Sequence, residues 1–262
     1  MELLEALRLQ WEWGGDEALL DAPQDRRAGS PPKQPVPPGP VPTPMAARRA
    51  AANAASALPM GREQAREIAD GCATLEALEA ALRDFSGCAL RDTATQLVFA
   101  DGAADARLII VGEAPGAEED RAGRPFVGPA GQLLDKMLAS IGLDRRQVRI
   151  VNTVPWRPPG NRAPTEAELN VCLPFLHRQI ALIAPRGLLA LGAVAAKTLL
   201  PAEMGRQGIR RLRGVWREVE IPGLPAPLPC LPSYHPAYLL RTPLAKAESW
   251  QDLLRLREWL EA

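Results

Sequence analysis

Hydrophobic positions follow two patterns along the second half of the chain. Short, mostly apolar runs at residues 107–111, 148–154, 187–191 and 230–234 predict four buried strands. Apolar residues three or four positions apart predict amphipathic helices at 132–141, 165–183, 193–200 and 246–260. Strands that alternate with helices form a mostly parallel sheet covered on both faces. We therefore expect an α/β protein: a three-layer α/β/α sandwich with a central, mostly parallel four-stranded sheet.

The first part of the chain follows other patterns. Residues 1–20 predict a short amphipathic helix, and residues 21–45 are rich in proline, which predicts an extended linker. Helical spacing returns at 46–57 and 61–85. Short strands are expected at 97–99 and near 219–221, and Trp250 is expected to face inward from the last helix. The expected organisation is thus an N-terminal helix, a linker and one α/β/α domain over residues 46–262.

Charge and cysteine content indicate which partners and which cellular compartment to expect. The 262 residues carry 31 Lys and Arg against 31 Asp and Glu, so any contact with nucleic acid must be local. The acidic start does not resemble a signal peptide, and no apolar run approaches the roughly 20 residues needed to span a bilayer. We expect a cytoplasmic protein without a membrane partner. The four cysteines are scattered, which favours free thiols.

The strand ends point to one site. Right-handed crossovers place the loops after residues 111, 154, 191 and 234 along one edge of the sheet. The first of these loops carries Glu113, Glu118, Glu119 and Asp120 and then Phe126, a combination that suits a pocket for a flat polar ligand. A strand-ending turn with a solvated acidic tail remains an equally simple interpretation, with Glu118 and Asp120 as its exposed face.

Four motifs follow one another along the chain: GEAPG with RPFVG within 112–128, Asn152 followed by RPPGNR at 157–162, LGAVAA at 191–196 and HPAYLLR at 235–241. In their order and spacing these motifs resemble the uracil-DNA glycosylase superfamily, family-4 type. The resemblance covers roughly residues 85–262 and implies a DNA repair enzyme that flips uracil out of DNA and hydrolyses its N-glycosidic bond. It implies single- or double-stranded uracil-containing DNA as the partner, a monomer, and nucleoid association during activity.

The resemblance also implies roles for single residues. Phe126 would stack on the base, Asn152 would pair with its N3–H and O4 edge, and His235 would donate to O2, where negative charge develops. Glu113 would position water or balance the charge on the sugar, with Glu119 as the competing carboxylate. The remaining expected substrate-binding residues are Gly112, Ala114, Pro115 and Gly116. In the best-known branch of the superfamily an aspartate orients the water where this chain has Ala114.

Contacts with DNA are expected from two segments. Leu239, Leu240 and Arg241 resemble the family's wedge, which fills the space left by the flipped base, although a plain helix start would have the same pattern. The second segment is an arginine-rich loop that would contact phosphates or simply be solvated, and its candidates are Arg206, Arg210, Arg211 and Arg213. We expect His177, on a helix, to be structural.

The cysteines depart from the family-4 pattern. Cys88 and Cys172 match two of the four iron–sulfur ligands and are remnants of that set, whereas Phe85 and Trp156 occupy the other two positions. A four-iron cluster needs its thiolates, so we expect no cluster, no metal and no other cofactor. Apolar packing by Phe85 and Trp156 would fill the vacated volume.

The expected activity is therefore that of a monofunctional uracil-DNA glycosylase that leaves an abasic site. The matched motifs contain no lysine for Schiff-base chemistry, and the loop at 157–165 has no histidine for covalent trapping of DNA. A non-catalytic binder of abasic or damaged DNA on the same fold is the alternative. A nucleotide-binding hydrolase is a third interpretation, without a supporting phosphate-binding motif.

Overall fold

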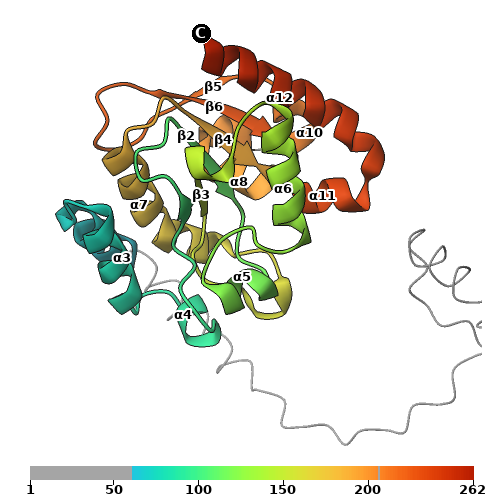
Figure 1. Ribbon diagram of the computed structural model, residues 1–262. Helices are drawn as coiled ribbons and strands as arrows, with labels where there is room; N and C mark the ends of the chain where they lie inside the picture. The colour runs from blue at the N-terminus through green and yellow to red at the C-terminus, as the bar shows by residue number, and fades with distance from the viewer. Residues whose placement is uncertain (1–60, 206) are drawn as a thin grey trace, which may run out of the picture. The chain divides into compact units, whose positions relative to one another are not determined.

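A computed structural model describes residues 61–262 with the exception of Arg206 (Figure 1). The helices expected at 1–20 and 46–57, and the linker expected at 21–45, lie outside the described residues.

The centre of the described chain is a sheet of six strands in the order β1-β3-β2-β4-β6-β5. Four of them pair in parallel, namely β2 (Leu108–Gly112), β3 (Arg149–Asn152), β4 (Gly187–Leu191) and β6 (Leu228–Ser233). The short edge strands β1 (Asp101–Gly102) and β5 (Arg217–Val219) are antiparallel to their neighbours. The expected four-stranded parallel centre is confirmed, and the two edge strands extend it.

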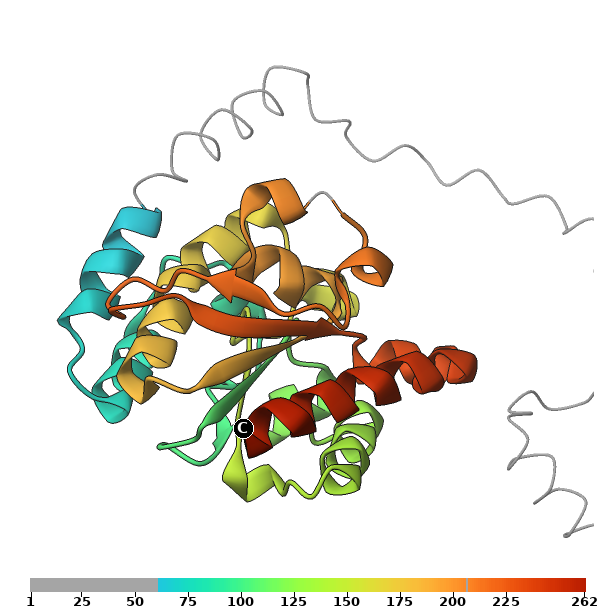
Figure 2. The same ribbon diagram turned by 90° about the horizontal axis from the view of Figure 1, so that it is seen from above.

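Helices cover both faces of the sheet (Figure 2). One face packs against α6 (Pro129–Ser140), α11 (Pro236–Arg241) and α12 (Lys246–Glu261). The other packs against α7 (Glu166–Ile183), α8 (Gly192–Leu199) and α10 (Ile209–Leu212). In β2, Leu108 and Ile110 point to the first face and Ile109 and Val111 to the second, as period-2 alternation requires. The three-layer α/β/α sandwich is thereby confirmed.

A third apolar cluster lies outside the sheet. Residues 61–71 are helical and are followed by α3 (Leu75–Asp84) and α4 (Leu90–Thr93). Their buried side chains pack against Val171, Cys172 and Phe175 of α7. The remaining short elements are α5 (Ala117–Ala122), α9 (Ala202–Gly205) and the 3₁₀ turns η1 (Arg145–Gln147), η2 (Pro159–Asn161) and η3 (Pro243–Ala245).

Two local predictions were wrong. Residues 97–99 form no strand: Val98 donates one backbone hydrogen bond to Pro155 at 2.9 Å, and the β1 ladder begins only at Asp101. Trp250 does not face inward but is 41% exposed, because the buried face of α12 is formed by Ser249, Asp252, Leu253 and Leu256.

The strand order also determines where a site can form. From β2 the chain crosses to β3 on one side, whereas from β4 it continues to β5 and β6 on the other. Ligands bind parallel sheets at such a reversal, beyond the carboxyl ends of the strands. Within residues 61–262, no helix combines the length and apolarity needed to cross a membrane.

Candidate active site

A cavity of about 430 Å³ opens beyond the carboxyl ends of β2, β3 and β6. It collects residues expected from the sequence: Glu113, Ala114, Pro115, Gly116, Glu119, Phe126, Asn152, His235 and Arg241. Residues without an assigned role complete the wall: Ala130, Pro158, Asn161, Arg162, Ala237 and Tyr238. The RPPGNR motif marked Pro158, Asn161 and Arg162 as belonging to the site, but its letters do not indicate what they contact.

Asn152 ends β3 and is 7% exposed. Its Oδ1 is buried and has no hydrogen-bond partner among the described residues. Gly112 lies opposite in the parallel ladder, and a β-carbon there would lie 2.4 Å from this oxygen. Gly112 is therefore necessary because its missing side chain leaves room for the amide. A buried acceptor without a partner is costly, which is typical of a group that pairs with a ligand.

Phe126 and His235 stack on each other at the wall of the cavity. Their ring centroids are 5.4 Å apart, with an interplanar angle of 28°. Phe126 has a φ of 54°, which is unusual for a residue with a β-carbon. Its ring edge also lies against Gly112, because an added β-carbon there would be 2.6 Å from Cε2. The aromatic ring thus borders the same space as Asn152 and the imidazole.

His235 is the N-cap of α11, and its Nδ1 accepts a hydrogen bond from the Ala237 amide at 3.2 Å. An Nδ1 that accepts leaves the proton of a neutral imidazole on Nε2. Burial, together with the charge of Arg241, lowers the pKa of His235 from 6.5 to about 4, and Glu119 opposes this shift. At neutral pH the side chain is therefore an uncharged donor through Nε2.

Glu113 follows β2 directly and lines the cavity with its side chain half-buried. Its backbone carbonyl is fixed by Thr153, whose Oγ1 donates at 2.5 Å, and by the Val154 amide at 3.4 Å. Burial raises the pKa of the Glu113 carboxyl above 4.5. The carboxylate is thus held by its backbone at the cavity wall next to Ala114.

Glu119, unlike Glu113, uses its carboxylate for hydrogen bonds to the backbone. Its carboxylate accepts hydrogen bonds from the amides of Gly116 at 3.0 Å, Val127 at 3.0 Å and Gly128 at 2.9 Å. These bonds connect the loop after β2 to the segment that carries Phe126. Asp120 is likewise not solvated as one interpretation had it: it is 3% exposed and accepts from the amide and hydroxyl of Thr95.

The expected wedge is divided between core and surface. Leu239 is 1% exposed and packs in the core with α6 and α12, so its assignment to DNA contact was wrong. Leu240 is 44% exposed, and Arg241 is exposed at the cavity rim. Helical periodicity explains the division, because adjacent residues on α11 point in different directions.

The arginines expected to contact phosphate differ in whether their side chains are exposed. Arg213 is committed to an internal ion pair: its Nη2 lies 2.6 Å from Oδ1 of Asp252, which is fully buried. The Arg213 side chain is only 12% exposed, so its assignment to DNA was wrong. Arg210 and Arg211 are exposed on α10, and Arg206 lies outside the described residues.

The four positions of the family's iron–sulfur ligands converge in the third apolar cluster. Phe85, Cys88, Trp156 and Cys172 are each less than 5% exposed there. The two sulfur atoms lie 3.9 Å apart, and the Phe85 ring packs on Phe175 at 5.0 Å. Two thiols within apolar packing do not fit a cluster that requires four thiolates. Within the described residues, no group of three or more His, Cys, Asp or Glu is placed to hold a metal ion.

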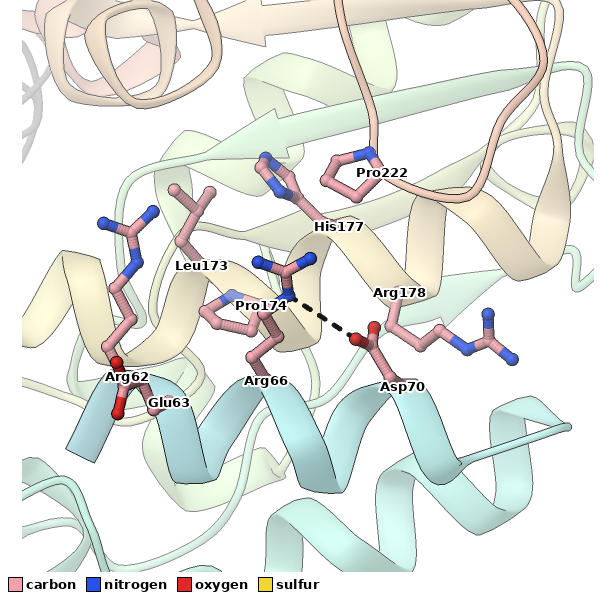
Figure 3. Close-up of a pocket in the computed structure, with 9 residues that line it drawn as sticks. All are labelled: Arg62, Glu63, Arg66, Asp70, Leu173, Pro174, His177, Arg178 and Pro222. Atoms are coloured by element: carbon pink, nitrogen blue, oxygen red, sulfur yellow. Dashed lines mark ion pairs between the residues drawn. The ribbon is translucent and has the colours of Figure 1, made fainter. Parts of the chain in front are cut away.

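A second cavity, of about 450 Å³, lies between the helix of residues 61–71 and α7 and shares no lining residue with the first (Figure 3). Arg66 pairs there with Asp70 at 3.5 Å. His177 lines it, and burial lowers the pKa of this histidine to about 4. None of the four matched motifs contributes to this cavity.

An α/β/α sandwich whose strand ends enclose an amide, a neutral imidazole, a carboxylate and an aromatic ring defines a protein that binds a flat polar heterocycle. Residues 99–254 match the family model described as the uracil DNA glycosylase superfamily. The chain belongs to the uracil-DNA glycosylase superfamily.

Individual relatives agree with this membership. A type-4 uracil-DNA glycosylase of Pyrobaculum aerophilum is 41% identical over 68% of this chain and 91% of that protein. One of Archaeoglobus fulgidus is 38% identical over 70% of this chain and 94% of its own length. A type-5 uracil-DNA glycosylase of Mycobacterium leprae is 38% identical over 38% of this chain and 50% of that protein.

Proposed function

We propose that the protein is a monofunctional uracil-DNA glycosylase, which flips uracil out of DNA and hydrolyses its N-glycosidic bond. Family membership and the names of the type-4 relatives support this activity. Asn152 is the observation within the site that supports the proposal, because its Oδ1 is a buried acceptor without a partner among the described residues and borders a cavity of about 430 Å³, which is large enough to admit a base.

Asn152 reads the base. Its Oδ1 accepts from uracil N3–H while its amide nitrogen donates to O4. Cytosine presents the opposite pattern at these two atoms, and would leave the buried oxygen unpaired. Sites that hydrogen-bond a substrate group reject analogues without it by roughly 10⁴-fold to 10⁵-fold. Phe126 contributes the apolar face on which the extruded base rests.

His235 stabilises the leaving group. Cleavage of the bond leaves negative charge on the uracil ring, and the Nε2–H of a neutral imidazole donates to O2 as that charge develops. Such a donor binds the transition state more tightly than the ground state. The hydrogen bond from the Ala237 amide to Nδ1 fixes the tautomer that this role requires.

Glu113 acts on the sugar side. Its ionised carboxylate orients water or balances the positive charge on the deoxyribose, as carboxylates do in glycoside hydrolysis. Water then adds to the anomeric carbon, and the product is an abasic site. Among the described residues that line this cavity there is no lysine, so hydrolysis rather than Schiff-base cleavage fits the wall.

DNA contacts are proposed for the exposed part of the predicted segments. Leu240 enters the space that the extruded base leaves, and Arg241 binds a flanking phosphate. Arg210 and Arg211 supply further phosphate contacts. We propose that the monomer acts on single- or double-stranded uracil-containing DNA in the cytoplasm, at the nucleoid.

One experiment tests the activity and its alternative. Uracil-containing oligonucleotides, single- and double-stranded, are incubated with the protein and then treated with alkali, which breaks the strand at abasic sites. We expect strand breaks with the wild type, about 10²-fold to 10³-fold slower formation with His235→Ala, and wild-type rates with His177→Ala as the matched control. A mobility shift of abasic DNA without any break would instead support the non-catalytic binder, which Ala114 favours.

A further inference from the structure

Arg145 connects three parts of the protein through its guanidinium group. Nη1 lies 2.7 Å from Oδ2 of Asp101 in β1, and Nε lies 2.9 Å from Oδ1 of Asp135 on α6. Nη1 also donates to the carbonyl of Pro125 at 3.1 Å, and Nη2 donates to the carbonyl of Phe126. The Arg145 side chain is 20% exposed and that of Asp101 21%, so their ion pair is partly shielded from water, whereas Asp135 is 48% exposed.

One of the two carbonyls that Arg145 binds is that of Phe126, whose backbone is strained. Phe126 has a φ of 54°, in the left-handed region that a β-carbon disfavours. Its carbonyl oxygen is held from the other side by α6, where a β-carbon on Gly131 would lie 1.8 Å from it. A strained conformation persists only where its surroundings hold it in place. The guanidinium on one side and the bare helix backbone on the other meet this requirement.

The strained backbone directs the Phe126 ring. The ring stacks on His235 and lies against Gly112 at the end of β2. A relaxed backbone at Phe126 would turn the ring away from both, open the cavity to water and uncover the imidazole. The hold of Arg145 on the carbonyl therefore affects the side chain at the base pocket.

We infer that Arg145 is a positioning residue for the base pocket: it holds Phe126 in the left-handed conformation that places the ring against His235. Arg145 does not line the cavity, so it acts through Phe126 and not on the substrate. The kinetic consequence rests on the proposed function, whereas the structural consequence does not.

The kinetic test compares neighbouring arginines. Arg146 is 88% exposed and pairs only with Asp144 among the described residues, so Arg146→Ala is a matched control for Arg145→Ala. We expect Arg145→Ala to slow single-turnover uracil release by about 10-fold to 100-fold, since small misplacements at a site have effects of this size. Arg145→Lys should recover part of the rate because one donor can still reach a carbonyl. Arg146→Ala should stay within about twofold of wild type.

A second measurement needs no catalysis. The chain has two histidines, so NMR titration can follow both imidazoles separately. Arg241, Glu119, Glu113 and Arg162 are the charged groups that line the cavity together with His235, and Arg145→Ala leaves all four in place. We expect the pKa of His235 to rise from about 4 towards 6.5 in Arg145→Ala, because the ring no longer shields it, and that of His177 to remain near 4.

The outcomes separate the two proposals. If Arg145→Ala and Arg146→Ala behave alike in rate and in the His235 titration, the positioning role is wrong. If the wild type releases no uracil, the proposed function fails, while the titration still decides the role of Arg145. If Arg145→Ala does not fold, Arg145→Lys carries the test, and a wild-type rate with an unchanged His235 titration would overturn the inference.

Discussion

Gly112 lies directly opposite Asn152 in the β2–β3 ladder, and the space of its missing side chain is occupied by the Asn152 amide and the Phe126 ring. A β-carbon at Gly112 would lie 2.4 Å from Oδ1 and 2.6 Å from Cε2 of that ring. Asn152 and Phe126, which we propose contact the edge and the face of a base, thus both depend on the space left by one glycine.

Gly112→Ala should therefore impair the pocket while leaving the sheet formed. The added methyl group displaces the amide and the ring together, and we expect uracil release to fall by about 100-fold. Gly71→Ala is the control, because nothing lies within 4 Å of a β-carbon there. Single-turnover rates and circular dichroism would check this, and equal rates for the two variants would contradict it.

The pH dependence of uracil release should show an acid limb. The proposed mechanism requires Glu113 to be ionised, and burial raises the pKa of its carboxyl above 4.5, so activity should fall as the pH drops through that raised value. His235 stays neutral down to about pH 4. Glu113→Gln should retain a slower residual activity. The pH profile of this variant should lack the limb caused by Glu113 and keep the limb near pH 4 that is caused by protonation of His235. A profile of kcat/KM from pH 3.5 to 8 tests this, and an unchanged limb in Glu113→Gln would exclude that residue as its cause.

Stability should also depend on pH through His235. Its folded pKa of about 4 lies below the unfolded 6.5, so between these values the unfolded chain binds the proton and the folded protein does not. The associated stability is complete above pH 6.5 and is lost as the pH falls towards 4, by about 3 kcal/mol for a shift of this size.

His235→Asn tests this linkage because asparagine can still cap α11. Urea unfolding at a series of pH values should show a smaller loss of stability between pH 6.5 and 4 than in the wild type. The contribution of His177 persists in both proteins, since burial lowers its pKa as well. Parallel curves for the two proteins would show that His235 does not titrate as described.

Substitutions of Leu239 and Leu240, which are adjacent in α11, should have different effects on stability and activity. Leu239→Ala removes a core side chain and should reduce the free energy of unfolding by about 2–5 kcal/mol. Leu240→Ala should leave stability nearly unchanged. It should slow uracil release from double-stranded DNA more than from single-stranded DNA, because only in a duplex does the extruded base leave a space in the base stack for Leu240 to occupy. Denaturant titrations and rates on both substrates would check this. Equal effects of Leu240→Ala on both strands would argue against a wedge.

The two remnant cysteines should be dispensable. The hydrogen bond that the Cys172 thiol donates to Cys88, together with burial, raises the pKa of Cys172, so this thiol remains protonated among apolar neighbours. We expect Cys88→Ala with Cys172→Ala to retain activity, with a small change in Tm, and both proteins to contain no iron. Iron analysis and the visible absorption spectrum measure this directly. Stoichiometric iron in the wild type, lost in the variant, would contradict it.

The parallel sheet and the position of the pocket could be predicted from the sequence because both depend on local pattern. Apolar runs give the strands, and the crossover rule places their ends on one edge. Asn152 ends β3 and His235 lies two residues beyond the end of β6, so their convergence in the cavity follows from topology.

Features that depend on distant partners could not be predicted in this way. Arg213 lies within an arginine-rich segment, and only the folded chain brings it to Asp252, 39 residues later. Asp120 resembles its solvated neighbours until Thr95 is placed beside it. The left-handed backbone of Phe126 has no sequence signal either, since the residue type argues against it.

The three backbone bonds of Glu119 have a consequence for changing what the pocket accepts. Because one carboxylate fastens the loop at Gly116 to the segment at Val127 and Gly128, these two stretches cannot be redesigned independently. If a library varies only the loop after β2, the unchanged segment at Val127 and Gly128 still determines where the Phe126 ring lies. Altered base selectivity should therefore arise from exchanging residues 112–128 as a single cassette.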